Sequence, residues 1–153
     1  MYYVISILPD MESDLIQILK TMLFSILFSC LAAALSSCAS DSSALQNTSW
    51  KLVQLNGQPV LANTAPTLAF DSENASGNSS CNSFSGPYSL QSDRLRFGSL
   101  MSTLMACMED GLMQQEGAYL SALQATVLYK IESEQLFLLD DDGQVLAVFD
   151  SVK

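Results

Sequence analysis

Turn-forming residues divide the chain after Trp50 into short apolar segments, and this pattern limits its fold more than any other feature. Asn56-Gly57 is a strong signal for a two-residue hairpin, because both residue types tolerate a positive φ. The segments expected to be strands are Trp50–Leu55, Pro59–Ala62, Thr67–Phe70, Tyr88–Gln91, Leu95–Phe97, Leu100–Cys107, Val127–Ile131, Leu136–Leu139 and Val145–Phe149. The pattern therefore predicts a mainly β fold.

One segment changes to a helical period. Between Leu112 and Ala125 the apolar side chains fall on one side of a helix, and Asp110 stands where it can cap the first turn. About eight or nine short strands and one helix predict an α+β fold, in which a small antiparallel, partly barrel-like β-sheet has one covering helix. In the first strand, alternation places Trp50, Leu52 and Gln54 on one face.

The N-terminal part has the layout of a bacterial lipoprotein signal. An apolar run over 21–36 follows Lys20 and leads into Leu35-Ser36-Ser37-Cys38, which resembles a lipobox. This predicts a signal peptide over 1–37, a lipidated tether over 38–46 with diacylglycerol on Cys38, and a folded domain over 47–153. An ordinary cleaved signal and an uncleaved anchor are the alternatives. Ala39 is not the aspartate that retains such lipoproteins in the inner membrane, so we expect the periplasmic face of the outer membrane.

Charge and composition exclude several classes of function. The chain has 16 acidic and 6 basic residues and no histidine. A net charge of −10 argues against nucleic acid, whose phosphates attract Lys and Arg. Without histidine, triad hydrolases and His-based zinc sites lose their usual base and ligand. The expected partners are therefore the membrane, through the lipid, and an envelope protein; no cofactor or catalytic residue is expected.

The cysteines predict one disulfide by subtraction. Cys30 leaves with the signal peptide and Cys38 is consumed by lipid, so Cys81 and Cys107 remain, in an oxidising compartment where an even pair usually bonds. The alternative is a pair of reactive thiols. Neither cysteine lies in a Cys-x-x-Cys motif, and no histidine or nearby lysine is available to lower a thiol pKa.

A Gly-, Ser- and Asn-rich loop over Ser76–Gly86 is the candidate site. Its members, with the tyrosine that follows, are Asn82, Phe84, Gly86 and Tyr88. They could form a ligand-binding loop. A structural role is favoured, because Asn82 can bond nearby backbone, Phe84 can fill the core, and Gly86-Pro87 can turn the chain.

Three further groups of residues are candidate sites of chemistry. Met101, Met105, Met108 and Met113 lie near Cys107, and their soft sulfur atoms suit Cu(I), although methionines more often fill a core. Glu132 and Glu134 resemble a paired-carboxylate hydrolase site, but such alternation is ordinary on an exposed strand face. The run Asp140–Asp142 is interpreted as a hairpin turn, because a calcium loop spaces its ligands at alternate positions.

Several motifs stand in the order typical of one family. They are Asn47-Thr48-Ser49-Trp50, Pro66–Phe70, Cys81-Asn82, Leu95–Gly98, Thr103–Cys107, Glu116 and Tyr119–Leu123. In this order the chain resembles the META domain family, which includes HslJ-like heat-shock lipoproteins. The family usually has Gly before the Cys-Asn pair and a basic residue in its T-x-M-A-C motif, whereas this chain has Ser80 and Leu104.

The resemblance implies an antiparallel β-fold with one helix, an envelope location, and links to stress or drug tolerance. It brings no set of catalytic residues. The function expected is that of a non-enzymatic envelope lipoprotein with a META-like domain that acts in binding or in stress or drug tolerance. The alternatives are a Met/Cys-based periplasmic copper-handling protein and a carboxylate-based hydrolase.

Overall fold

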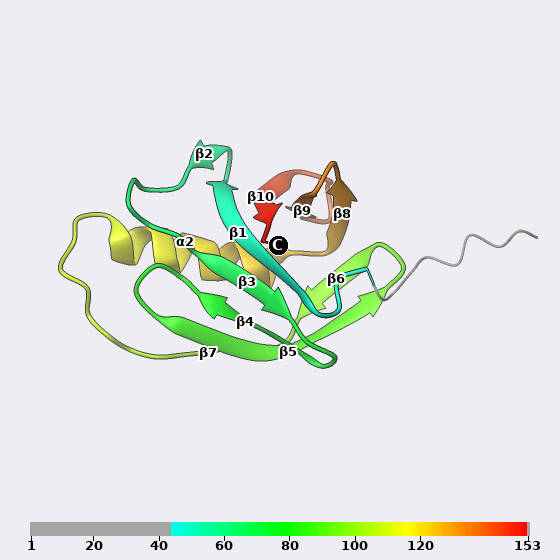
Figure 1. Ribbon diagram of the computed structural model, residues 1–153, viewed down its shortest axis with the longest axis horizontal. Helices are drawn as coiled ribbons and strands as arrows, with labels where there is room; N and C mark the ends of the chain where they lie inside the picture. Colours follow the sequence, from blue (N-terminus) through cyan, green and yellow to red (C-terminus); the bar gives the residue numbers. More distant parts are fainter. Residues whose placement is uncertain (1–43, 153) are drawn as a thin grey trace, which may run out of the picture. The chain divides into compact units, whose positions relative to one another are not determined.

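A computed structural model describes residues 44–152, which are drawn in colour in Figure 1. The elements are β1 (Thr48–Leu55), β2 (Gln58–Pro59), β3 (Thr67–Phe70), β4 (Asn74–Asn78), β5 (Ser83–Gln91), β6 (Arg94–Phe97), β7 (Met101–Ser102), α2 (Leu112–Ala125), β8 (Leu128–Glu132), β9 (Gln135–Leu139) and β10 (Val145–Ser151). Within the described residues α2 is the single helix, so the predicted mainly β fold with one helix is confirmed. The signal peptide and the lipidated Cys38 predicted in segment 1–43 lie outside the described residues.

The strands belong to one antiparallel sheet whose pairings form a ring. From β1 the order is β3, β4, β5, β6, β8, β9 and β10, and β10 pairs back with β1. The short strands β2 and β7 pair with β1 and β5. The link between β6 and β8 is a single residue pair, Arg94 with Leu128. That the sheet is partly barrel-like stays a prediction.

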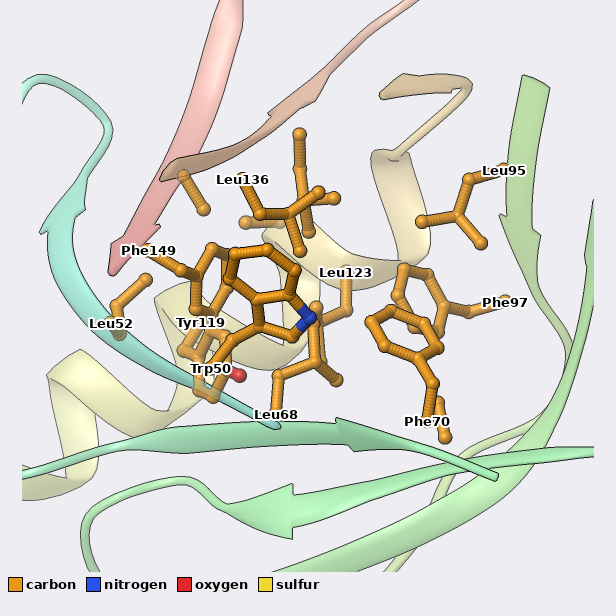
Figure 2. Packing of buried hydrophobic residues seen from close by; sticks show 14 of the residues in the cluster. Trp50, Leu52, Leu68, Phe70, Leu95, Phe97, Tyr119, Leu123, Leu136 and Phe149 are labelled. Carbon is orange, nitrogen blue, oxygen red and sulfur yellow. The ribbon is translucent and has the colours of Figure 1, made fainter. Parts of the chain in front are cut away.

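The helix covers the apolar interior that the sheet leaves open (Figures 1 and 2). Tyr119 lies at the centre of this contact: its ring packs on Phe84 and Phe149, with ring centroids 5.7 Å and 6.1 Å away. Complete burial raises the pKa of the Tyr119 phenol well above its usual value, and its hydroxyl donates to the Thr67 carbonyl oxygen. The other large core side chains are Leu45, Trp50, Leu52, Leu55, Leu68, Phe70, Leu95, Phe97, Leu123, Leu136 and Leu138.

The helix has the predicted bounds, but the predicted cap is wrong. Its N-cap is Gly111, with φ 78°, and no side chain caps it. The Gly111 carbonyl oxygen accepts from the Gln115 amide at 2.9 Å. Glycine adopts this left-handed φ without strain, so the N-cap position falls at Gly111, one residue after Asp110.

A β-bulge alters the predicted face of the first strand. Against β10, the register of β1 shifts between Leu52 and Gln54. Because a bulge exchanges the two faces of a strand, Leu55 is buried and Gln54 is exposed, the reverse of the prediction. The hairpin after it is confirmed, with φ 49° at Asn56 and 75° at Gly57.

The folded part also begins earlier than the predicted residue 47. Leu45 is fully buried in the core, and the Thr48 hydroxyl donates to its carbonyl oxygen at 2.5 Å. A tether that ends at residue 46 would leave this leucine in water. Segment 39–46 is mostly polar in composition, so sequence reasoning did not predict that Leu45 packs in the core.

Between Ser76 and Cys107, a predicted loop forms strands and a predicted strand is mostly loop. The predicted loop Ser76–Gly86 is mostly the paired strands β4 and β5, joined by a turn over 79–82. Gly86 and Pro87 lie inside β5, so they do not turn the chain. Conversely, the predicted strand Leu100–Cys107 pairs only at Met101–Ser102. Pro59–Ala62 is likewise reduced to the two-residue β2.

The described residues contain no helix of the length and apolar character needed to cross a bilayer. The predicted anchor falls in segment 1–43, so it stays a prediction.

Candidate functional site

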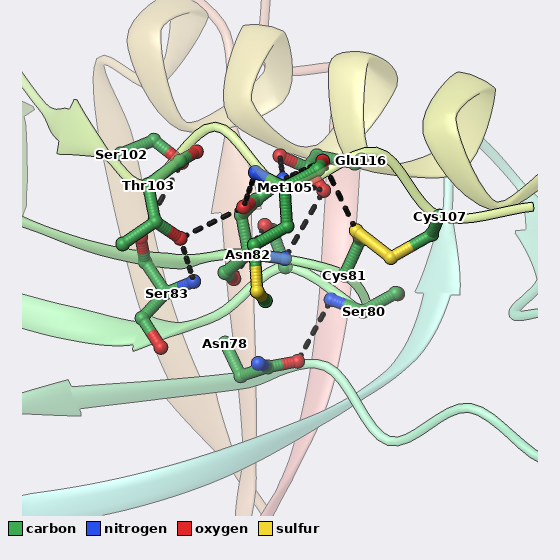
Figure 3. Close-up of a disulfide and its surroundings, with 11 residues drawn as sticks. Asn78, Ser80, Cys81, Asn82, Ser83, Ser102, Thr103, Met105, Cys107 and Glu116 are labelled. Carbon is green, nitrogen blue, oxygen red and sulfur yellow. Dashed lines mark hydrogen bonds between the residues drawn. A yellow bond between two sulfur atoms is a disulfide. The ribbon is translucent and has the colours of Figure 1, made fainter.

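Asn82 is the centre of a buried polar cluster at the end of the β4–β5 hairpin (Figure 3). Its side chain is 1% exposed. The amide oxygen accepts from the Thr103 hydroxyl and from the Met105 backbone N–H, both at 2.8 Å. The amide nitrogen donates to the Met105 carbonyl oxygen at 3.2 Å. One side chain therefore replaces the strand pairing that segment 103–107 lacks.

Glu116 reaches the same cluster from the inner face of α2 and is 6% exposed. Its carboxylate oxygens accept from the Asn82 amide nitrogen at 3.0 Å and from the Asn82 backbone N–H at 3.2 Å. No buried side-chain polar atom of residues 44–152 lacks a hydrogen-bond partner. Since a buried acceptor without a donor is costly, this complete pairing fits a structural role for the cluster.

A disulfide joins Cys81, beside Asn82, to Cys107 in the segment that leads to the helix (Figure 3). The two Cα atoms lie 6.0 Å apart, within the usual disulfide range. The Cys81 sulfur also lies 3.5 Å from the Met105 carbonyl oxygen. Thr103, Met105 and Cys107 are thus held at alternate positions, two by hydrogen bonds and one covalently.

Gln115 makes a second set of polar contacts next to this cluster. Its amide nitrogen donates to the Ser80 hydroxyl at 2.7 Å and to the Thr64 hydroxyl at 3.2 Å. Its amide oxygen accepts from the Leu61 backbone N–H at 2.7 Å. The helix therefore binds the β4–β5 turn and the β2–β3 connection through adjacent residues.

Ser80 occupies a backbone conformation that favours glycine, with φ 100°. We expect Ser80→Gly to be about 1 to 2 kcal/mol more stable than Ser80→Ala, because both variants lose the Gln115 bond but only glycine relieves the backbone strain. Denaturant unfolding of the two variants measures this difference. Comparison with wild type gives the cost of losing the Ser80–Gln115 hydrogen bond. Equal unfolding free energies of the alanine and glycine variants would contradict backbone strain at this position.

The other predicted site residues point into the domain along β5. Phe84 is a core side chain that is 3% exposed. A Cβ on Gly86 would lie 2.5 Å from the Ser99 carbonyl oxygen, so a crossing segment requires glycine there. The Tyr88 ring packs edge-on against Phe70 at 5.0 Å, and its hydroxyl donates to the Asp71 carbonyl oxygen. Partial burial raises the pKa of this phenol.

The methionines do not fill the core, contrary to the usual expectation for this residue. Segment 101–113 exposes five large apolar side chains: Met101 at 76%, Leu104 at 97%, Met105 at 57%, Met108 at 95% and Met113 at 48%. We call these five residues the Met101–Met113 surface. Met101, Met105 and Cys107 do not share a strand face, because the strand ends at Ser102.

This surface is apolar and acidic. Glu109 and Asp110 are exposed between Met108 and the start of α2. The sequence has no lysine or arginine between Arg96 and Lys130. In a domain with few basic residues, this region carries none.

The candidate carboxylate sites, Glu132 with Glu134 and the run Asp140–Asp142, are ordinary surface features. Glu132 pairs with Lys130 at 3.1 Å, and Glu134 lies in the β8–β9 turn with φ 66°, so the two glutamates do not alternate on one strand. Asp140 accepts from the Asp142 and Gln144 backbone N–H groups, which confirms the hairpin turn. In the described part of the chain, no three His, Cys, Asp or Glu residues could together hold a metal ion.

Residues 43–153 match the META domain family. The chain belongs to this family, and the match begins close to the buried Leu45. The sequence and structural motifs assembled around Asn82 thus define one META domain. No curated protein matches the chain.

Three solved structures are similar to the domain. A protein from Burkholderia xenovorans, solved by NMR, is 34% identical, with a TM-score of 0.59 over 71% of this chain and 84% of its own. A second NMR structure is 27% identical, with a TM-score of 0.56 over 69% of this chain and 90% of its own. A crystal structure of a DUF4847 family protein from Bacteroides vulgatus is 11% identical, with a TM-score of 0.56 over 71% and 94%, and shows the fold alone.

Sequence reasoning missed what Glu116 and Gln115 do. A signal for Glu116 existed: it lies four residues after Leu112 and three before Tyr119, so a carboxylate falls on the apolar stripe of the helix. Such a residue needs a buried polar partner. That partner, Asn82, is 34 residues away, and no spacing rule joins them.

Proposed function

We propose that the protein is a non-enzymatic, lipid-anchored binding module of the bacterial envelope that contacts another envelope protein through the Met101–Met113 surface. The observation that carries the proposal is the exposure of five large apolar side chains on a segment whose backbone is held at Thr103, Met105 and Cys107. Monomeric proteins rarely expose large apolar patches unless something binds there, so five exposed apolar side chains between residues 101 and 113 favour a partner at this segment. Its setting is tolerance of envelope stress or of drugs, as the HslJ-like members of the META family suggest.

The fixed backbone favours specific binding over incidental exposure. Asn82 and the disulfide hold segment 103–107, so little backbone freedom is lost when a partner binds. The methionine side chains stay flexible and can adapt to a partner's shape. Thioether and alkyl groups neither donate nor accept protons, which favours binding over catalysis at this surface.

The place of the surface in the domain favours a protein partner over the anchor's own membrane. In Figure 1 the segment after β7 lies at one end of the domain, whereas the chain enters β1 near the other. From Cys38 to Leu45 the chain spans at most about 25 Å. A lipid on Cys38 is therefore attached through the entry end, and the Met101–Met113 surface lies at the other end of the domain, where a periplasmic protein can reach it.

Site-specific photocrosslinking in the bacterium tests this function. A photoreactive residue at position 104 is expected to crosslink to one envelope protein, and the same residue at position 131 is not; Ile131 is also exposed, at 37%. Mass spectrometry of the same preparation is expected to find lipidated Cys38 as the N-terminus. Crosslinks only to lipid or to other copies of the chain would contradict the binding role, and an N-terminus upstream of Cys38 would contradict the anchor.

A further inference from the structure

We infer that the Met101–Met113 surface binds a cationic amphipathic segment of its partner protein, in which apolar side chains alternate with lysine or arginine. This inference rests on the proposed function and names the chemistry of the partner. Its apolar half follows from the exposure of Leu104 and Met108, at 97% and 95%. Its cationic half follows from the charges that border them.

Glu109 and Asp110 directly follow Met108 and have no basic partner among residues 44–152. The ion pairs between described residues are Arg94 with Asp141 and Lys130 with Glu132, both in other parts of the sheet. The two carboxylates therefore face solvent beside the apolar side chains. A partner that covers the apolar part places its own flanking residues next to these carboxylates, and lysine or arginine there gains attraction while acidic residues are repelled.

Charge disfavours a second copy of the chain as the occupant. Residues 38–153 contain 13 acidic and 5 basic residues, a net charge of −8. A symmetric contact through this surface would bring Glu109 and Asp110 of one copy toward the same residues of the other. The absence of lysine and arginine between Arg96 and Lys130 leaves no compensating charge in this stretch of either copy.

Charge and position also disfavour an anionic lipid surface. Juxtamembrane binding to anionic lipids uses clusters of lysine and arginine, and this surface has carboxylates instead. The chain enters β1 near the opposite end of the domain, so the predicted lipid is attached away from this surface (Figure 1). A basic, partly apolar polypeptide segment complements the carboxylates of Glu109 and Asp110 and can reach a surface that lies away from the lipid attachment.

Binding of a defined peptide tests the inference. The probe is a fluorescent 14-residue helical peptide of leucine and lysine, and its counterpart has glutamate at every lysine position. The full mature protein is held in zwitterionic nanodiscs, and empty nanodiscs give the background. We expect the lysine peptide to bind at least tenfold more tightly than the glutamate peptide, with an affinity that falls as salt rises.

Paired variants separate the two halves of the surface. Leu104→Ser with Met108→Ser, and Glu109→Gln with Asp110→Asn, are each expected to weaken lysine-peptide binding about tenfold. Matched controls away from the surface are Ile131→Ser with Val145→Ser, and Asp93→Asn with Asp142→Asn; these should bind as wild type does. Glu109→Lys with Asp110→Lys should reverse the preference and bind the glutamate peptide. All of these positions are exposed or partly exposed, and circular dichroism confirms that each variant is folded.

Three results would overturn the inference. One is equal binding of the two peptides, another is lysine-peptide binding that survives both surface variants, and the third is dimerisation of wild type that Leu104→Ser abolishes. The proposed function fails separately, when position 104 crosslinks to no envelope protein. A crosslinked partner that lacks a basic apolar segment would contradict this inference but would still support the proposed binding function.

Discussion

Replacing Cys81 and Cys107 together by serine is expected to lower the free energy of unfolding by about 3 to 4 kcal/mol. The disulfide closes a loop of 26 residues, and the chain-entropy model assigns a loop of this size that stabilisation. A typical domain has only about 5 to 15 kcal/mol in total, so the variant should lose a large share of its stability. Denaturant unfolding of the oxidised wild type and the double variant measures the change.

Reduced wild type is the matched control for the serine substitutions. It should unfold with the double variant, because both lack the cross-link and keep the Asn82 hydrogen bonds to Thr103 and Met105. Thiol counting on denatured protein from an oxidising envelope should find no free thiol before reduction and two after it. Two alkylatable thiols, or equal stability of oxidised and reduced protein, would contradict the prediction.

Local sequence signals predicted the parts of the fold that local physics decides. The helix begins at Leu112 and ends at Ala125 as predicted, because its apolar stripe has one period throughout. The Asn56-Gly57 turn is also as predicted, since both residues adopt the positive φ that their types favour. Neither feature depends on which distant segment lies beside it.

Distant neighbours decided the parts that sequence reasoning mispredicted. Strand β4 has the sequence Asn-Ala-Ser-Gly-Asn, which is rich in turn formers, yet β3 and β5 pair with it on either side. Strand propensity depends strongly on such context. Segment 103–107 has a strand-like composition, but the Asn82 side chain takes the backbone groups of Met105 that a ladder would use.

The candidate site was predictable in its residues but not in its arrangement. Cys81, Asn82 and Cys107 were identified, and the structure brings them together. The Met101–Met113 surface was not anticipated, because composition alone assigns methionine and leucine to the core. The core is already filled by side chains of the sheet and of α2, so the residues between β7 and α2 remain outside it.

Trp50→Ala is expected to cost about 3 to 5 kcal/mol of unfolding free energy, the range for deleting a large buried aromatic side chain. Trp50 is 4% exposed and lies in the centre of the core in Figure 2. Trp50 is paired with Leu68 of β3 and with Ser151 of β10. A cavity at this position therefore weakens the packing where β1 joins both neighbouring strands of the sheet. Chemical unfolding, followed by circular dichroism because the variant lacks the tryptophan, measures the loss.

Two variants separate burial from other causes. Trp50→Phe keeps most of the apolar volume but loses the hydrogen bond that the indole nitrogen donates to the Thr48 hydroxyl at 2.8 Å, so it should cost clearly less than alanine. Leu104→Ala truncates a side chain that is 97% exposed, so its stability should stay within about 0.5 kcal/mol of wild type. A Trp50→Ala protein that unfolds with wild type, or red-shifted and readily quenched Trp50 emission in the native protein, would place this side chain at the surface.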